Sequence, residues 1–281
     1  MFNINGEILA SEDASISILN RGFQYGDALF ETIRVINSEI MFWEDHYFRL
    51  MASMRILRME IPSSFSPEFL EAEIKSLIEA NNLSQQPSKI KINVWRKDGG
   101  LYTPESREVN YMISAYPISE SFYVLSGNDY EVELFKDHYV ASGLLSSIKS
   151  NNKLVSILAS IYAEENDYQN CLLLNDQKSV IEASNGNLFI VKENLVKTPP
   201  ISDGCLNGII RKQVMSILGE LEGIELKEES ISPFELQKAD ELFITNVIKG
   251  IQPITKYRKK FFSTDFSKRL IGLLNAKARL N

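Results

Sequence analysis

The sequence of 281 residues is poor in the residue types that most often build metal sites and disulfide frameworks. Its two cysteines, Cys171 and Cys205, lie far apart and form no CxxC pair. This usage fits a reducing compartment and leaves a disulfide scaffold or a structural zinc site without support. The two histidines, His46 and His138, have neither a metal-ligand spacing nor a triad spacing, so we expect no metal. If the protein is an enzyme, lysine is the leading candidate for its acid–base chemistry, and a reactive lysine usually implies a carbonyl cofactor or substrate.

Long apolar runs and an excess of positive charge are also missing. No stretch approaches the ~20 apolar residues that a membrane span needs, and the start of the chain, MFNINGEILASED, lacks the features of a signal peptide. The formal net charge of −7 argues against nucleic acid, whose binders neutralise phosphates with Lys and Arg. Neither GxGxxG nor the P-loop pattern occurs, which disfavours nucleotide binding. The sequence therefore predicts a cytoplasmic protein with no membrane or nucleic-acid partner.

The chain alternates between strand and helix signals. Asn5-Gly6 and Asn37-Ser38 each separate two short apolar runs and predict β-hairpins. Ser66 and Pro67 supply an N-cap and a first helical residue for a helix with apolar side chains at helical spacing. The order of hairpins and helices predicts an α+β fold. We expect an N-terminal α/β domain over residues 1–116, a linker over 117–124 and a C-terminal domain over 125–281.

Further apolar residues recur at helical spacing. They predict a helix over residues 44–57 and a second over 209–221. Leu154, Ile157, Leu158 and Ile161 form a third stripe of this kind.

Three charged residues have local contexts that allow chemistry without requiring it. Lys149 lies in SGLLSSIKSNNKL, just before the 154–161 stripe, where a surface lysine is also an ordinary finding. Glu182 ends an apolar strand in VIEASNGNLF; a carboxylate there can hold a pyridine ring protonated, or be a solvated turn residue. Arg49, in EDHYFRL, can clamp a phosphate in bidentate fashion or lie exposed on its helix.

A fourth candidate is an anion site at a helix start. Gly208 precedes Ile209 and Ile210, where we expect a helix to begin. The first amides of a helix and its dipole attract phosphate, although a glycine in an ordinary loop explains the same residues.

Taken in order, six segments resemble the class IV aminotransferases, the fold-type IV group of pyridoxal-phosphate enzymes. These segments are RGFQYGDALFETIRV, HYFRL, IKSNNKL, VIEASNGNLF, LNGIIR and FITNV. The group includes branched-chain aminotransferases, D-amino acid aminotransferases and aminodeoxychorismate lyases. The resemblance extends from Gly6 to about Ile254 and implies a two-domain fold like that of D-amino acid aminotransferase.

The resemblance also implies roles for individual residues. Lys149 corresponds to the lysine that binds pyridoxal 5′-phosphate and moves a proton at the substrate α-carbon. Glu182 corresponds to the partner of the pyridine nitrogen. The remaining residues implied to bind the phosphate or lie near it are Arg49, Ile209, Ile210, Thr245 and Asn246. Many relatives have threonine at the position of Ile210, which here retains only the backbone amide. Thr245 and Asn246 are expected in a loop.

Individual residues favour one member of the family. Asn152 and Lys153 in KSNNKL resemble the pattern of the lyases. Branched-chain aminotransferases have a tyrosine where this chain has Leu154, and D-amino acid aminotransferases have one at Phe30. We therefore expect an aminodeoxychorismate lyase that releases 4-aminobenzoate and pyruvate. An amino-acid aminotransferase, acting on branched-chain or D-amino acids with a 2-oxo acid acceptor, is the alternative. A non-catalytic binding protein that retains the fold is a distant third.

The substrate pocket is the least defined part of the sequence. Arg96, in NVWRKDGGLY, is a candidate partner for a substrate carboxylate or else a rim arginine. Tyr25, Glu31 and Tyr102 complete the candidate substrate-binding set. By resemblance, the site lies between two domains and borrows residues from a second subunit, so we expect a homodimer.

Overall fold

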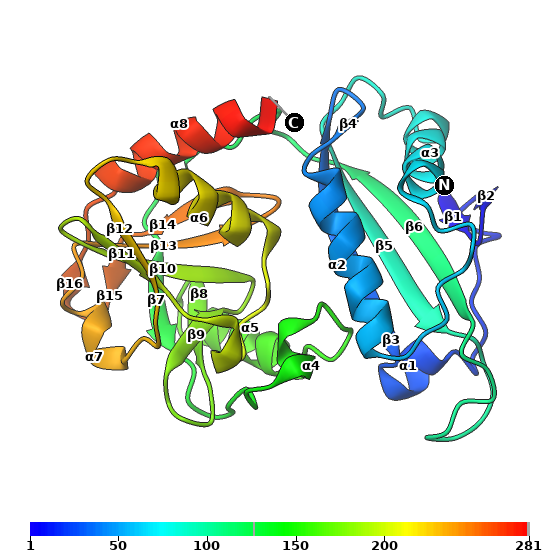
Figure 1. Cartoon of the computed structure of the whole chain (residues 1–281), viewed down its shortest axis with the longest axis horizontal. Coiled ribbons are helices and arrows are strands. Elements are labelled where there is room, and N and C mark those ends of the chain that lie inside the picture. Colours follow the sequence, from blue (N-terminus) through cyan, green and yellow to red (C-terminus); the bar gives the residue numbers. More distant parts are fainter. Residues whose placement is uncertain (126, 280–281) are drawn as a thin grey trace. The chain divides into compact units, whose positions relative to one another are not determined.

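The computed structural model describes residues 1–125 and 127–279 and divides the chain into two compact units. Residues 1–121 and the short segment 149–152 form the first unit, and residues 122–148 with those from 153 onward form the second. The boundary after residue 121 falls inside the expected linker. The segment 149–152, however, groups with the first unit, whereas the sequence places it in the C-terminal domain. Helices and strands occur in both units, and the α+β class is confirmed (Figure 1).

The first unit is built on a six-stranded antiparallel sheet in the order β2-β1-β6-β5-β3-β4. Its strands are β1 (Phe2–Ile4), β2 (Glu7–Leu9), β3 (Ala28–Ile36), β4 (Glu39–Ile40), β5 (Ser88–Arg96) and β6 (Val109–Pro117). Both predicted hairpins are confirmed. Asn5 and Gly6 have φ of 53° and 92°, and Asn37 and Ser38 have φ of 49° and 63°. Positive φ at both central residues is the geometry of tight hairpin turns.

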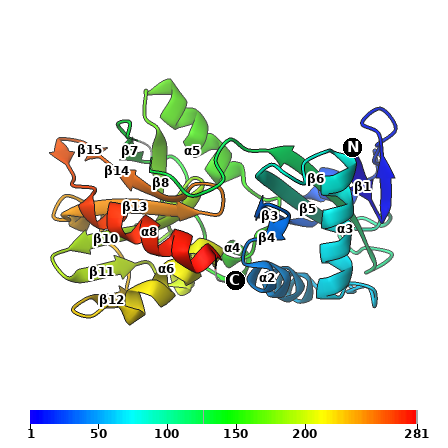
Figure 2. The same cartoon turned by 90° about the horizontal axis from the view of Figure 1, so that it is seen from above.

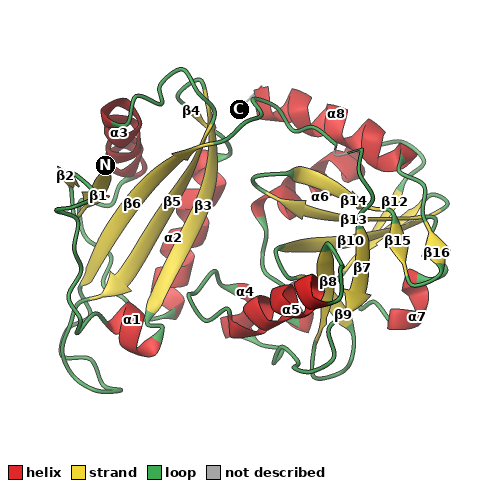
Figure 3. Cartoon of the chain, turned by 180° about the vertical axis from the view of Figure 1, so that it is seen from behind, coloured by secondary structure: helices red, strands yellow, loops and turns green. Residues whose placement is uncertain are grey.

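Two long helices cover one face of this sheet. Figure 3 shows β3, β5 and β6 in front with the helices behind them. The helices of the unit are α1 (Arg21–Tyr25), α2 (Trp43–Ile56) and α3 (Pro67–Ala80). The predicted N-cap of α3 is confirmed, since the Ser66 side chain accepts a hydrogen bond from the Phe69 amide. The buried faces of α2 and α3 then pack against β3 and β6.

The second unit contains a larger, mixed sheet. Its strands are β7 (Glu131–Leu134), β8 (Asn170–Leu174), β9 (Val180–Ala183), β10 (Gly186–Lys192), β11 (Leu195–Thr198), β12 (Glu225–Glu228), β13 (Glu241–Asn246), β14 (Gly250–Ile254), β15 (Lys256–Tyr257) and β16 (Lys260–Phe261). Most neighbours are antiparallel, but β7 runs parallel to β8 and β15, and β11 runs parallel to β12. Strand β10 pairs with β9, β11 and β13, so it is a central element of the unit.

Helices flank this sheet, as Figure 2 shows. They are α4 (Leu144–Ser147), α5 (Leu154–Glu165), α6 (Ile209–Glu220), α7 (Pro233–Leu236) and α8 (Asp265–Arg279), with a 3₁₀ turn η1 (Ile201–Asp203). Helix α5 packs on β8 through small residues, because Ala159 and Ala163 are buried. Its apolar stripe points the other way, and Leu154 is 73% exposed.

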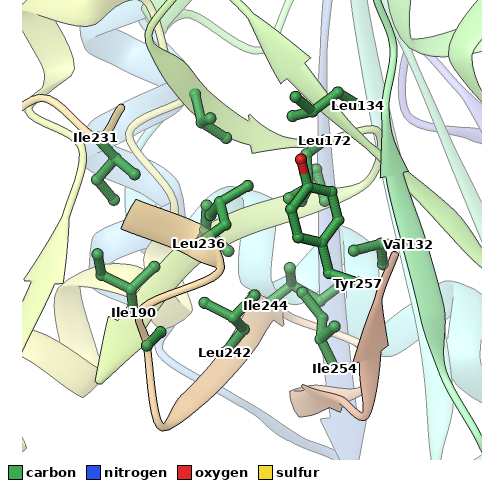
Figure 4. Close-up of a cluster of buried hydrophobic side chains, with 14 of the residues drawn as sticks. Val132, Leu134, Leu172, Ile190, Ile231, Leu236, Leu242, Ile244, Ile254 and Tyr257 are labelled. Atoms are coloured by element: carbon green, nitrogen blue, oxygen red, sulfur yellow. The ribbon is translucent and has the colours of Figure 1, made fainter. Parts of the chain in front are cut away.

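The core of the second unit is an aliphatic cluster between strands and α7 (Figure 4). Val132, Leu172 and Leu242 are buried in it together with the ring of Tyr257. This packing fixes β9, β10 and β13, the strands whose ends provide candidate site residues. No helix in the described ranges is long and apolar enough to cross a membrane.

Candidate active site

The backbone around Lys149 is fixed by strand β3 of the first unit. The Phe30 amide donates to the Lys149 carbonyl oxygen at 2.8 Å, and the Asn151 amide donates to the Ala28 carbonyl oxygen at 3.0 Å. Segment 149–152 therefore lies antiparallel beside the start of β3. The Nζ atom of Lys149 lies 4.3 Å from the centre of the Phe30 ring, and the side chain is half-buried. A fixed backbone with a partly dehydrated amine suits a lysine that reacts with carbonyl groups.

A buried cluster of three charged or polar side chains joins β3 to α2. Glu31 accepts two hydrogen bonds from Arg49, from Nε to Oε1 at 2.8 Å and from Nη2 to Oε2 at 2.6 Å. Oε2 also lies 2.7 Å from Nδ1 of His46. Because an ionised carboxylate can only accept, His46 donates here and carries its proton on Nδ1. Helix α2 brings His46 and Arg49 together, since residues three apart share a helix face.

The ionisation of this cluster follows from its burial and charge. Burial by itself would raise the pKa of Glu31, but the Arg49 charge and the hydrogen bonds from His46 and Arg49 lower it to about 2. Burial lowers the pKa of His46, and the cations Arg49 and Lys149 act in the same direction against the opposing effect of Glu31. Glu31 is therefore ionised and His46 neutral at neutral pH. The Nε2 atom of His46 is buried and has no hydrogen-bond partner within the described residues.

The segment that follows Lys149 packs closely on the loop before β3. Gly26 has φ of +65°, and a β-carbon at this position would lie 2.4 Å from Oδ1 of Asn152. Only glycine fits both the backbone conformation and the contact. The Asn152 amide of the KSNNKL segment is thereby placed against the RGFQYGD segment.

In the second unit, the Glu182 side chain accepts a hydrogen bond from the backbone. Its Oε2 atom accepts a hydrogen bond from the Leu206 amide at 2.9 Å. The carbonyl of Leu206 in turn accepts from Nδ2 of the buried Asn187, at 2.7 Å. Glu182 and Asn187 face each other across the β9–β10 pair. These contacts fix the loop that leads into α6 relative to the two strands.

Helix α6 begins directly after this loop, with Gly208 as its N-cap. A β-carbon on Gly208 would lie 1.9 Å from Oδ1 of Asn187, so the close approach requires glycine. Ile209 and Ile210 are buried first residues of the helix, and amides in this position have no partner within the helix. The start of α6 has the donors and the dipole orientation that an anion needs.

Thr245 and Asn246 are the last residues of β13, not loop residues as the sequence suggests. Thr245 pairs with Asn187 on β10, and Asn246 pairs with Gly250, so the strand ladder continues through both. The Thr245 hydroxyl is buried and has no hydrogen-bond partner in the described part of the chain. The Asn246 side chain accepts from the amides of Ile248 and Lys249 and closes the turn after the strand.

The candidate substrate residues have other contacts in this structure. Arg96 is buried, and its guanidinium donates to Asp27 and to the carbonyl oxygens of Leu57 and Arg58. This geometry is that of a structural arginine. Tyr25 and Tyr102 pack edge to face with ring centres 6.0 Å apart, and Tyr102 is 92% exposed. Glu31 lies in the buried cluster with Arg49 and His46.

The sequence prediction assigned no role to two residues of this region. His46 lies three residues before Arg49 in the same segment, so the helical spacing was a usable signal. Asn187 gave no local signal, because its contacts with Leu206 and Gly208 join a strand to a loop about twenty residues later. Within the described residues, no group of three His, Cys, Asp or Glu side chains is arranged to hold a metal ion.

Known proteins resemble this chain over most of its length. The family described as "Amino-transferase class IV" matches residues 28–257. The D-alanine aminotransferase of Listeria monocytogenes serotype 4b is 30% identical over 264 residues, covering 90% of this chain and 86% of that protein. The aminodeoxychorismate lyase of Vibrio harveyi is 26% identical over 282 residues, covering 98% of this chain and 100% of that protein.

A solved structure of an aminotransferase is also similar to this chain over nearly its whole length. The branched-chain aminotransferase of Thermoproteus uzoniensis, determined with norvaline, has a TM-score of 0.88 and 26% identity, covering 99% of this chain and 94% of that one. The similarity in fold therefore extends over both units of the chain.

Proposed function

The chain belongs to the class IV aminotransferases, a family of pyridoxal-phosphate-dependent enzymes, and from this premise we propose that it is an aminodeoxychorismate lyase. The observation that carries the choice is the segment after Lys149. Asn152, which the lyase pattern shares, packs against Gly26, and position 154 is a leucine, which has no hydroxyl to offer a cofactor. The reaction would release 4-aminobenzoate and pyruvate.

The residues of the second unit fit the phosphate and the ring nitrogen of pyridoxal 5′-phosphate. The Thr245 hydroxyl is buried without a partner among the described residues, and the first amides of α6 at Ile209 and Ile210 have none within the helix. A phosphate group would accept hydrogen bonds from donors of this kind. Glu182 has the carboxylate that a protonated pyridine nitrogen needs, and Asn246 completes the set by holding the turn after Thr245.

Lys149 and Arg49 of the first unit are assigned to the same cofactor. When bound, the cofactor supplies a sink for the electrons that form at the substrate α-carbon. Lys149 would hold the cofactor, and its amine, once free of the cofactor, would remove the proton from the α-carbon of the bound substrate. Glu182 would hold a proton on the ring nitrogen. Arg49, oriented by Glu31 and His46, contributes positive charge for the phosphate.

An amino-acid aminotransferase is the second candidate, because relatives with that activity match this chain over most of its length. The two reactions share the proton removal by Lys149 and differ in the next step. In the lyase, the carbon–oxygen bond to the enolpyruvyl group would break. This group would leave as pyruvate, and the ring, which keeps its amine, would become 4-aminobenzoate. In the aminotransferase, Lys149 would return its proton at the carbon that joins the amine to the cofactor, and hydrolysis by water would release a 2-oxo acid.

One paired assay separates the two activities. The holoenzyme is incubated with aminodeoxychorismate and 4-aminobenzoate is measured; in parallel, amino exchange from amino acids to 2-oxoglutarate is measured. We expect 4-aminobenzoate and little amino exchange. No 4-aminobenzoate together with efficient exchange would establish the aminotransferase instead.

The role of Lys149 has its own test. Purified wild-type protein with cofactor should absorb near ~400 nm, and borohydride should remove that band, as expected of a lysine bound to a carbonyl cofactor. Lys149→Ala should abolish the band. Lys178→Ala, at an exposed turn, is the matched control and should keep it.

We further propose a cytoplasmic homodimer. The two cysteines are both free and buried, which is typical of a reducing compartment. Helix α5 exposes Leu154, Ile157, Leu158 and Ile161 along one face, and a contiguous apolar helix face is typical of an interface.

A further inference from the structure

Strands β10 and β11 of the second unit share a patch of side chains that the proposed function does not use. In their antiparallel register, Ile190 lies opposite Lys197, and Lys192 lies opposite Leu195. Residues two apart on a strand point to the same face of the sheet, so all four side chains lie on one face of this strand pair. The patch therefore alternates an aliphatic side chain with a lysine, both along the strands and across them.

This patch is one wall of a cavity in the second unit. The other wall comes from α7 and the residues after it, Glu235, Lys238 and Ala239, and the cavity has a volume of about 170 Å³. Ile190 and Ala239 are buried and belong to the aliphatic core of the unit. Lys192 and Lys238 are exposed. The cavity therefore has an aliphatic floor and a mouth with two lysines.

The three lysines that line the cavity differ in their partners. Lys197 pairs with Glu235 at 2.8 Å and with Glu229 at 3.3 Å. Among the described residues, no carboxylate oxygen lies within ion-pair distance of Lys192 or Lys238. The one carboxylate in the lining, that of Glu235, is thus already paired, and the mouth keeps two cations that can bind an anion.

The cavity is separate from the proposed phosphate site, although strand β10 contributes to both. Asn187, near the start of β10, contacts the loop that leads into α6. Lys192 is the last residue of the same strand, and five residues of extended strand span roughly 16 Å. None of the lining residues is assigned to the cofactor or the substrate, so a molecule bound here is an additional ligand.

We propose that this cavity binds a small carboxylate whose apolar body has about the size of one ring. A cavity of roughly 150 Å³ holds a benzene ring, so the volume admits a ring against Ile190 and Ala239. The carboxylate then lies at the mouth and accepts charge-assisted hydrogen bonds from Lys192 and Lys238. 4-Aminobenzoate has this chemistry, and only its identity as a product of this enzyme rests on the proposed function.

The test uses benzoate as the probe, together with two molecules that each lack one half of it. Benzoate, acetate and benzyl alcohol are titrated into the holoenzyme by calorimetry. We expect benzoate to bind most tightly, because it alone has both the ring and the charge, and its affinity should fall as salt is added.

The lysines at the mouth are tested by a double variant. Lys192→Met with Lys238→Met should weaken benzoate binding by about tenfold and leave the binding of benzyl alcohol unchanged. Lys227→Met is the matched control, because Lys227 lies on the neighbouring strand β12, pairs with Glu225 at 2.9 Å and does not line the cavity. This control should bind benzoate as wild type does.

A further variant separates this cavity from the proposed active site. Lys149→Ala should retain the benzoate binding that depends on Lys192 and Lys238. The inference is overturned if benzoate binds no more tightly than acetate, if the double variant and Lys227→Met bind it equally well, or if Lys149→Ala abolishes its binding. The ~400 nm band reports on the cofactor separately. A wild type that lacks this band but binds benzoate through the two lysines refutes the proposed function and supports the cavity site.

Discussion

At the scale of single residues, the carboxylate of Glu31 determines the state of the buried cluster in the first unit. It is the shared acceptor for Arg49 and His46, and both partners are almost fully buried. A buried ion pair is costly to break, since removing one charge leaves the other without compensation. Arg49 is also the residue proposed to face the phosphate, so its orientation depends on Glu31.

Glu31→Gln should therefore destabilise the protein and change its response to acid. At pH 7 we expect a loss of about 3 kcal/mol in the free energy of unfolding, because Arg49 loses its paired charge. The folded pKa of Glu31 is lowered from 4.5 to about 2. A carboxyl of this kind contributes stability that is present above pH 4.5 and is lost as the pH falls toward 2. Urea unfolding between about pH 7 and pH 3 should show a smaller acid-dependent loss for Glu31→Gln than for wild type. Parallel curves would contradict this account.

The hydroxyl of Tyr257 contrasts with the carboxylate of Glu31, because it is a buried polar group without a hydrogen-bond partner among the described residues. It lies in the aliphatic core of the second unit near Leu134 and has no hydrogen-bond partner in the described residues (Figure 4). Burial raises the pKa of Tyr257 to about 12, so the group stays neutral. Tyr257→Phe should leave stability unchanged or raise it by about 1 kcal/mol. Tyr130→Phe is the control, because its hydroxyl accepts from Asn170 at 3.0 Å, and it should lose about 1 kcal/mol. Thermal unfolding of both variants tests the contrast; a marked loss in Tyr257→Phe would reveal a partner for the hydroxyl.

At the scale of elements, the start of α6 is the most constrained feature of the proposed phosphate site. Gly208→Ala would place a methyl group 1.9 Å from Oδ1 of Asn187, and either the helix start or Asn187 must move. We expect the affinity for pyridoxal 5′-phosphate to fall by about tenfold or more, because the amides of Ile209 and Ile210 shift from their positions. Titration of the cofactor, followed by absorbance, measures this loss.

A second glycine in the same helix supplies the control. Nothing lies within 4 Å of a β-carbon at Gly219, so Gly219→Ala should leave cofactor affinity unchanged and stabilise the helix by about 0.5–1 kcal/mol. If the two variants bind the cofactor equally well, the start of α6 is not the phosphate site.

The elements also show what could be predicted from sequence and what could not. The hairpin at Asn5-Gly6 and the cap at Ser66 were predictable, since each depends on residues that are neighbours in the chain. The pairing of β15 with β7 joins Lys256 to Glu131 across more than a hundred residues, and no local pattern indicates it. The contact between Glu31 and His46 joins a strand to a helix in the same way. Side-chain pairs of this kind can be identified only once the three-dimensional structure is known.

At the scale of the whole molecule, the exposed apolar face of α5 is a surface that no other part of the described chain covers. Periodicity shows the stripe but not its direction, and the structure buries Ala159 and Ala163 while Leu154 and Ile157 are 73% and 52% exposed. Exposure of large aliphatic side chains to water is unfavourable, and their burial against another surface lowers the free energy. A second copy of the chain is the covering surface that the proposed homodimer provides.

The double substitution Ile157→Asp and Ile161→Asp tests this arrangement, because the two residues are one helical turn apart and both exposed. Each buried isoleucine contributes roughly 1.5–3 kcal/mol, so the dimer dissociation constant should rise by about a hundredfold or more. Sedimentation over a range of concentrations should then show a dimer for wild type and a monomer for the variant. Phe234→Asp is the control, since Phe234 on α7 is 79% exposed and lies outside the stripe, and it should remain dimeric. A wild type that sediments as a monomer, or a double variant that remains fully dimeric, would show that α5 is not the interface.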